Sequence, residues 1–177
     1  MARKLKSAAA LSVVGTIILV IMYNKISIGV LLSLTITMGT ISYHLVMRLI
    51  VGTVFQLIMH NEADLNKQWY RVGKRELAIY DKTNIKKWKK RMPTYDNSAF
   101  DPKKHSWDEI AQAMCQAELV HEVIIVMSFL PVIEGIWFGD YLIFVITSVL
   151  AAGCDLVFVM MQRYNRQRIV KLMKRRS

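Results

Sequence analysis

Four long apolar segments are the feature that most limits what this chain can fold into. They cover Ala8–Met22, Ile28–Met47 with an extension to Met59, Ile110–Leu130 and Ile136–Met161. Each is close to, or longer than, the roughly 20 residues that a membrane-spanning helix needs. With 54% apolar residues and only 3 Pro and 8 Gly in 177 residues, the chain is predicted to be an all-α integral membrane protein with about four transmembrane helices.

The basic residues predict how these helices cross the membrane. Three of them precede the first span, and Lys25 is the one basic residue between the first two spans. Twelve Lys and Arg lie between His60 and Trp107, and seven follow Met161. By the positive-inside rule both termini and the central segment are cytoplasmic. We therefore divide the chain into an N-terminal hairpin with an interfacial extension (1–60), a basic cytoplasmic or interfacial segment (61–106), a second hairpin with polar residues (107–162) and a basic cytoplasmic tail (163–177).

The second apolar segment is too long for one perpendicular crossing. As a helix, Ile28–Met59 measures about 48 Å, against a hydrocarbon core of about 30 Å. Tyr43, His44 and Arg48 are expected to mark the cytoplasmic interface, and a lone histidine there is typical of snorkelling or packing. Three alternatives remain for Leu49–His60: it lies along the surface, dips back into the membrane, or continues as a tilted helix.

The central segment alternates aromatic and aliphatic residues with basic ones, which predicts an amphipathic cap on the membrane surface. Its densest basic cluster is Lys86–Arg91. Attraction to anionic lipid and control of topology explain such a cluster, and so does a phosphate-binding edge for a substrate, with Trp88 and Lys89 as contacts. Nucleic acid is not expected, because no nucleic-acid-binding fold is recognisable and the basic residues lie between spans.

The third apolar segment carries three polar residues that only a polar site or a helix contact explains. It begins at a Ser-x-x-Glu capping box, Ser106–Glu109, which predicts a helix start. Glu118 and His121 are three residues apart and share one helix face, and Glu122 flanks it. A carboxylate that orients an imidazole is the arrangement of a general base. Polar glue between helices is the alternative, and a metal site would need a second Glu-x-x-His, which the chain lacks.

A second constellation lies where the fourth apolar segment ends. Arginine can bind phosphate or carboxylate through two parallel hydrogen bonds, and here the arginines alternate with residues that form directional hydrogen bonds. Asp155, two helical turns earlier, is expected to pair with an Arg or His of the bundle. Topology control and lipid contact are the simpler reading of this basic run. The candidate substrate-binding residues are Gln162, Arg163, Tyr164, Asn165 and Arg166.

Together these motifs carry a family resemblance. The Ala-Glu-Leu-Val-His of 117–121 and the Gln-Arg-Tyr-Asn-Arg-Gln-Arg of 162–168, with Trp88-Lys89 and Pro93 before them, resemble the glycosyl-4,4'-diaponeurosporenoate acyltransferase family. Its members are small bacterial membrane enzymes that acylate the sugar of a glycosylated carotenoid. The resemblance covers about Trp69–Lys174. The chain departs from the family's pattern at Glu122, where the family usually has Trp, and at Asp155, where it tends to have Asn followed by Pro.

The resemblance implies acyl transfer from a thioester, with acyl-CoA as co-substrate and no bound cofactor, to a hydroxyl of a lipid-linked or glycosylated acceptor. His121 would be the base and Glu118 its orienting carboxylate, in the bacterial cytoplasmic membrane with the site facing the cytoplasmic leaflet. Arg163, Tyr164 or Asn165 would stabilise the oxyanion or hold donor phosphates. The expected partners are the bilayer, acyl-CoA and the acceptor, and the sequence is compatible with an oligomer. The alternative is a non-catalytic lipid-binding or accessory subunit of a membrane complex.

Overall fold

The protein is described by a computed structural model that places residues 2–88, 98–139 and 141–175. All regular elements within these ranges are helical. Five helices form the body within these ranges: α1 (Ala2–Ile26), α2 (Gly29–Met59), α5 (Trp107–Met127), α6 (Pro131–Phe138) and α7 (Tyr141–Met173). Between α2 and α5 lie four short elements: η1 (Gln68–Tyr70), α3 (Lys74–Lys82), α4 (Ile85–Trp88) and η2 (Ser98–Phe100).

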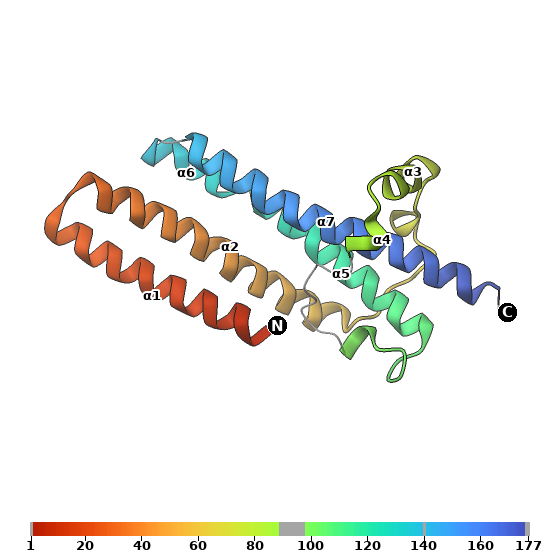
Figure 1. Cartoon of the computed structure of the whole chain (residues 1–177). Coiled ribbons are helices and arrows are strands. Elements are labelled where there is room, and N and C mark those ends of the chain that lie inside the picture. The colour runs from red at the N-terminus through yellow and green to blue at the C-terminus, as the bar shows by residue number, and fades with distance from the viewer. Residues whose placement is uncertain (1, 89–97, 140, 176–177) are drawn as a thin grey trace.

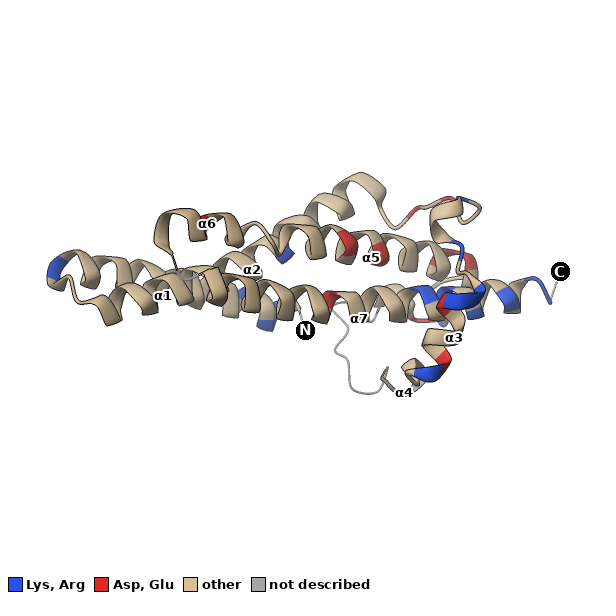
Figure 2. Ribbon diagram, turned by 90° about the horizontal axis from the view of Figure 1, so that it is seen from above, with Lys and Arg blue, Asp and Glu red and all other residues tan. Residues whose placement is uncertain are grey.

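The all-α membrane fold is confirmed. Four helical stretches are long and apolar enough to cross a membrane: Ala2–Ile26, Gly29–Met59, Trp107–Phe138 and Tyr141–Lys174. Their outward faces carry large apolar side chains such as Leu11, Val126 and Leu142, each more than two-thirds exposed, as lipid-facing residues are. Figure 2 shows Lys and Arg gathered around α3 and along the C-terminal part of α7, with a further group near the N-terminus, which lies closer to the middle of the molecule. A cytoplasmic location for these residues remains a prediction.

The helices form two hairpins that meet near their polar end (Figure 1). In the first, α1 lies against α2, and the hydroxyls of Thr16 and Ser42 are 2.9 Å apart across the pair. In the second, α5 and α6 both lie against α7. The hairpins are joined where Met47 and Val51 of α2 pack against Ile124 of α5.

Helix α2 is continuous to Met59, so the chain neither breaks nor turns back within Leu49–Met59. The position of this stretch relative to the membrane surface remains a prediction. Nothing between Leu49 and Met59 interrupts the backbone hydrogen bonding, because the segment holds no proline and its one glycine is tolerated within a helix. The helix ends at His60, whose φ of 51° is left-handed. From there the chain turns into a strap, residues 61–67, that crosses α5.

The second hairpin begins at the predicted capping box. The capping box at Ser106 is confirmed, since its hydroxyl accepts a hydrogen bond from the Glu109 amide. Pro131 starts α6, because proline suits the first turn of a helix. The chain reverses at Gly139, with φ 74°, and α7 then continues without a break to Met173. Residues 163–173, within the predicted basic tail, are therefore the last part of α7.

The described part of the cap, α3 and α4, packs against α7. Tyr80 of α3 and Ile85 of α4 are buried against Met161 of α7, and Leu77 and Trp88 pack around them. This places the cap beside the stretch of α7 that carries the arginines.

Candidate functional site

A histidine cluster joins three helices in the interior of the bundle. It consists of His121 on α5, Asp155 on α7 and Arg48 on α2. The Nδ1 atom of His121 lies 2.8 Å from Oδ1 of Asp155, and Arg48 donates from Nη2 to the other carboxylate oxygen. Asp155 is 2% exposed, whereas His121 and Arg48 are each 22% exposed. The ring of Phe158 stacks on the imidazole, with centroids 4.6 Å apart and planes 5° from parallel.

These contacts determine which imidazole nitrogen carries the proton. An ionised carboxylate only accepts hydrogen bonds, so neutral His121 places its proton on Nδ1, facing Asp155. The Nε2 lone pair is then left unprotonated, and among the described residues no side chain hydrogen-bonds to Nε2. This is the state that a general base requires.

The prediction that Glu118 orients His121 is wrong, because Asp155 holds the ring and Glu118 belongs to a separate arginine cluster. Arg163 donates to Oε1 of Glu118 over 2.6 Å, and Arg166 donates to Oε2. Three-residue spacing gave Glu118 and His121 a common face, but α7 offers each a closer partner. Long arginine side chains reach Glu118 from one turn of α7, and Asp155 meets His121 from an earlier turn.

The arginine cluster also fastens the central segment to the hairpin. Arg163 donates from Nε to Glu76 of α3 over 2.6 Å and from its terminal nitrogens to the carbonyls of Trp69 and Arg71. Arg166, 3% exposed, donates to the carbonyl of Tyr70 over 2.7 Å. Both guanidinium groups are therefore occupied by protein. The sequence-based expectation that these residues hold donor phosphates remains a prediction, and Arg166 also lines a cavity of about 780 Å³.

Glu76 is the partly exposed member of this cluster. Because it connects the cap to Arg163, we expect the packing of the cap to depend on pH. Burial alone raises the pKa of Glu76, but hydrogen bonds from Arg163 and Tyr80 outweigh burial, so the pKa lies below its ordinary value of 4.5. A lowered folded-state pKa means that the stabilisation is complete above the unfolded-state pKa and is lost as the pH falls through the folded-state value. We expect Trp fluorescence of the cap to be constant from pH 8 to 5 and to change below about 4.5. A Glu76→Gln variant should lack that acid transition, and an unchanged transition in the variant would contradict the assignment.

The remaining predicted contact residues do not converge on His121. Glu122 accepts a hydrogen bond from Trp69 Nε1 over 2.9 Å. Trp88 packs in the cap, and Tyr164 lies edge-on to Tyr80 with the Arg168 guanidinium over its ring. Gln162 and Asn165 are half-buried on α7. Lys89 and most of the Lys86–Arg91 cluster lie outside the described residues.

Sequence reasoning missed several residues of the two clusters. Arg48 was assigned to the membrane interface, and its charge within an apolar segment was the signal that it had a buried partner. Glu76 gave no signal, because an acid in a basic amphipathic segment is ordinary. His44 was expected to snorkel or to pack, and it is buried at 8% exposure on the face of α2 that also carries Arg48.

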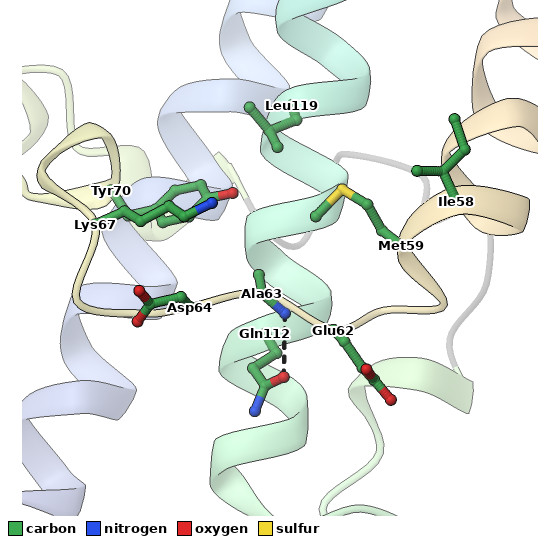
Figure 3. A pocket seen from close by; sticks show the side chains of 9 residues that line it. All are labelled: Ile58, Met59, Glu62, Ala63, Asp64, Lys67, Tyr70, Gln112 and Leu119. Atoms are coloured by element: carbon green, nitrogen blue, oxygen red, sulfur yellow. Dashed lines mark hydrogen bonds between the residues drawn. The ribbon is translucent and has the colours of Figure 1, made fainter.

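Two cavities lie beside α5, and Figure 3 shows the residues that line the first. The first, about 620 Å³, lies between the strap, the end of α2 and α5, and its wall includes Met59, Tyr70 and Leu119. The second, about 780 Å³, shares Ala63, Asp64, Tyr70 and Gln112 with it. Leu119 precedes His121 by two residues, which is about 200° around a helix. His121 accordingly lines neither of these cavities within the described part of the chain.

The strap over these cavities is fastened by glutamine side chains. The Ala63 amide donates to Gln112 over 3.1 Å, drawn as the dashed line in Figure 3, and the Asn61 amide donates to Gln116 over 2.6 Å. Burial raises the pKa of Tyr70, next to the strap, to about 12, so its phenol is neutral at physiological pH. Among the described residues no three His, Cys, Asp or Glu side chains are placed to hold a metal ion.

Fold and site define a class: a four-span helical membrane protein with a carboxylate-oriented histidine inside the bundle. Comparison with known families is more specific. The profile of the glycosyl-4,4'-diaponeurosporenoate acyltransferase family matches residues 66–175. Because the match covers more than half of the chain, this protein belongs to that family. No curated protein and no solved structure gave a significant match.

Proposed function

We propose that the protein transfers a fatty acyl group from a thioester such as acyl-CoA to a hydroxyl of a lipid-linked or glycosylated acceptor. The observation that carries the proposal is the 2.8 Å contact of His121 Nδ1 with Asp155, which leaves Nε2 as an unprotonated base. Membership of an acyltransferase family supports the reaction class.

In the proposed reaction, Nε2 of His121 takes the proton of the acceptor hydroxyl as its oxygen attacks the thioester carbonyl. The new C–O bond gives a tetrahedral intermediate, whose C–S bond then breaks. The imidazolium returns the proton to the departing thiolate, so the products are an ester and a free thiol. Asp155 stabilises the imidazolium while it exists, and Arg48 forms an ion pair with the other Asp155 oxygen.

The depth of the histidine cluster suits substrates that arrive from two phases. Arg48 lies nineteen residues after Gly29, about 28 Å along α2, which is close to the thickness of the hydrocarbon core. The cluster would then lie at the inner boundary of the membrane under the predicted orientation. A thioester could approach from the cytosol and a lipid acceptor from the leaflet. We assign the arginine cluster to holding the cap in place.

The test is transfer by the purified protein in lipid vesicles. The vesicles would be supplied with isotope-labelled acyl-CoA and a lipid extract from a glycolipid-producing bacterium. Mass spectrometry should detect a labelled acyl ester that does not form without the protein. If no thioester donor yields a labelled ester, the accessory-subunit alternative gains support, because buried ion pairs that join helices also suit a scaffold.

The site predicts an unusually harmful conservative substitution, Asp155→Asn. Arg48 only donates hydrogen bonds, so the new amide must turn its oxygen toward Arg48 and its NH2 toward His121 Nδ1. The imidazole would then carry its proton on Nε2 and could not act as the base. We expect turnover to fall by about 10²- to 10⁴-fold, measured in the same assay.

Two further variants make this prediction specific. Adding Arg48→Met to Asp155→Asn should restore part of the activity, because the amide oxygen is then free to face His121. Cys154→Ser, an exposed neighbour on α7, should leave turnover unchanged. Wild-type turnover in Asp155→Asn would exclude control of the imidazole proton by Asp155.

A further inference from the structure

One buried imidazole remains without a partner beside the proposed site. His44 is 8% exposed, and neither Nδ1 nor Nε2 has a hydrogen-bond partner among the described residues. Buried polar side chains are nearly always paired, so each unpaired one needs an explanation. An absent substrate is one such explanation.

The position of His44 points toward the histidine cluster. His44 precedes Arg48 by four residues, so both side chains leave the same face of α2. Arg48 connects the His44 backbone to Asp155. Its Nη1 donates to the His44 carbonyl over 3.1 Å, and its Nη2 donates to Asp155. The charges of Arg48 and Asp155 both act on the His44 ring.

Contacts made by the residues around His44 determine its position in the bundle. Its ring lies edge-on to Tyr43, with centroids 5.5 Å apart, and the Tyr43 hydroxyl donates to the Met127 carbonyl of α5 over 2.7 Å. Met47, one turn on, is packed against Ile124 of α5. His44 is therefore held at the α2–α5 contact, on the membrane side of Arg48.

We propose that His44 is a second substrate-contacting imidazole, which donates a hydrogen bond to the thioester carbonyl oxygen. This inference rests on the proposed acyl transfer and completes it. The mechanism needs a donor for the negative charge that develops on that oxygen, and Arg163, one of the residues expected to provide it, donates to Glu76 and Glu118. A neutral imidazole has one N–H to donate and bears no charge that must be buried when substrate is absent.

His44→Leu separates this role from a structural one. Replacing an unpaired buried polar group with an apolar one of similar size should leave thermal stability unchanged or raise it. The loss of an oxyanion donor should nevertheless lower kcat by about 10²- to 10³-fold, with a smaller effect on the KM for acyl-CoA. His44→Asn and His44→Gln place an amide N–H near the former Nδ1 and Nε2 respectively. At least one of them should retain more turnover than His44→Leu.

Ser148→Ala is the matched control. Ser148 is also fully buried with its hydroxyl unpaired among the described residues, but it lies on α7 two turns from Asp155, about 10 Å along the helix. It should lose no activity. Wild-type kcat in His44→Leu, or a loss matched by unfolding, would overturn the inference while leaving the acyl transfer intact. Absence of transfer by the wild-type protein would remove both.

Discussion

His121→Ala should abolish acyl transfer while the protein remains inserted and folded. Removing the base leaves the acceptor hydroxyl without a proton acceptor, which lowers turnover by at least about 10²-fold and up to 10⁴-fold. Folding should survive, because His121 is partly exposed and Asp155 keeps its ion pair with Arg48. The measurement is labelled ester formed per minute in vesicles, together with the thermal unfolding midpoint.

His105→Ala provides the matched control for that variant. His105 is an exposed histidine just before α5, 3.8 Å from Glu109, and its loss should not change turnover. If His121→Ala retained wild-type turnover, the base would have to be another group. A variant that lost activity only through unfolding would indicate that His121 holds the helices together.

Glu118→Ala should have the largest effect on stability. Glu118 is fully buried and balances two arginines, and removing one partner of a buried ion pair typically costs about 3–5 kcal/mol. Arg163 would keep Glu76, but Arg166 would retain only the Tyr70 carbonyl as a hydrogen-bond partner among the described residues. We expect a lower unfolding midpoint in detergent and faster proteolysis of the strap and cap.

Glu122→Ala is the control for Glu118→Ala. It tests whether removing any carboxylate from α5 lowers stability by the same amount. Glu122 lies one turn from Glu118 but accepts a single hydrogen bond, from Trp69. Its loss should cost no more than about 1 kcal/mol. Equal destabilisation by the two variants would contradict the role of Glu118 as the centre of the arginine cluster.

The two clusters also restrict how activity and stability can be separated. His121 and Glu118 belong to one motif in the sequence, yet His121 contacts the residue proposed to orient it and Glu118 contacts the residues that hold the cap. Variants at the first should lower turnover without unfolding, and variants at the second should unfold the cap first. If His121 and Glu118 belonged to one site, variants at either residue would lower turnover and stability together.

The sequence by itself determined the membrane fold and the family. Long apolar segments must form helices in a bilayer, because only internal hydrogen bonding satisfies their backbone. The start of α5 followed from its capping box, since that contact is local. Ala-Glu-Leu-Val-His and Gln-Arg-Tyr-Asn-Arg carried the family resemblance and named most polar residues of both clusters.

Only the tertiary structure decided which of these residues meet. Spacing places Glu118 and His121 on one face of a helix but does not say what the opposite helix presents to each. The rotation of α7 brings Asp155 to His121 and the arginines to Glu118, and the approach of α2 adds Arg48. Helical periodicity is a property of one segment, whereas partner choice depends on the relative rotation and depth of several segments, which local sequence does not encode.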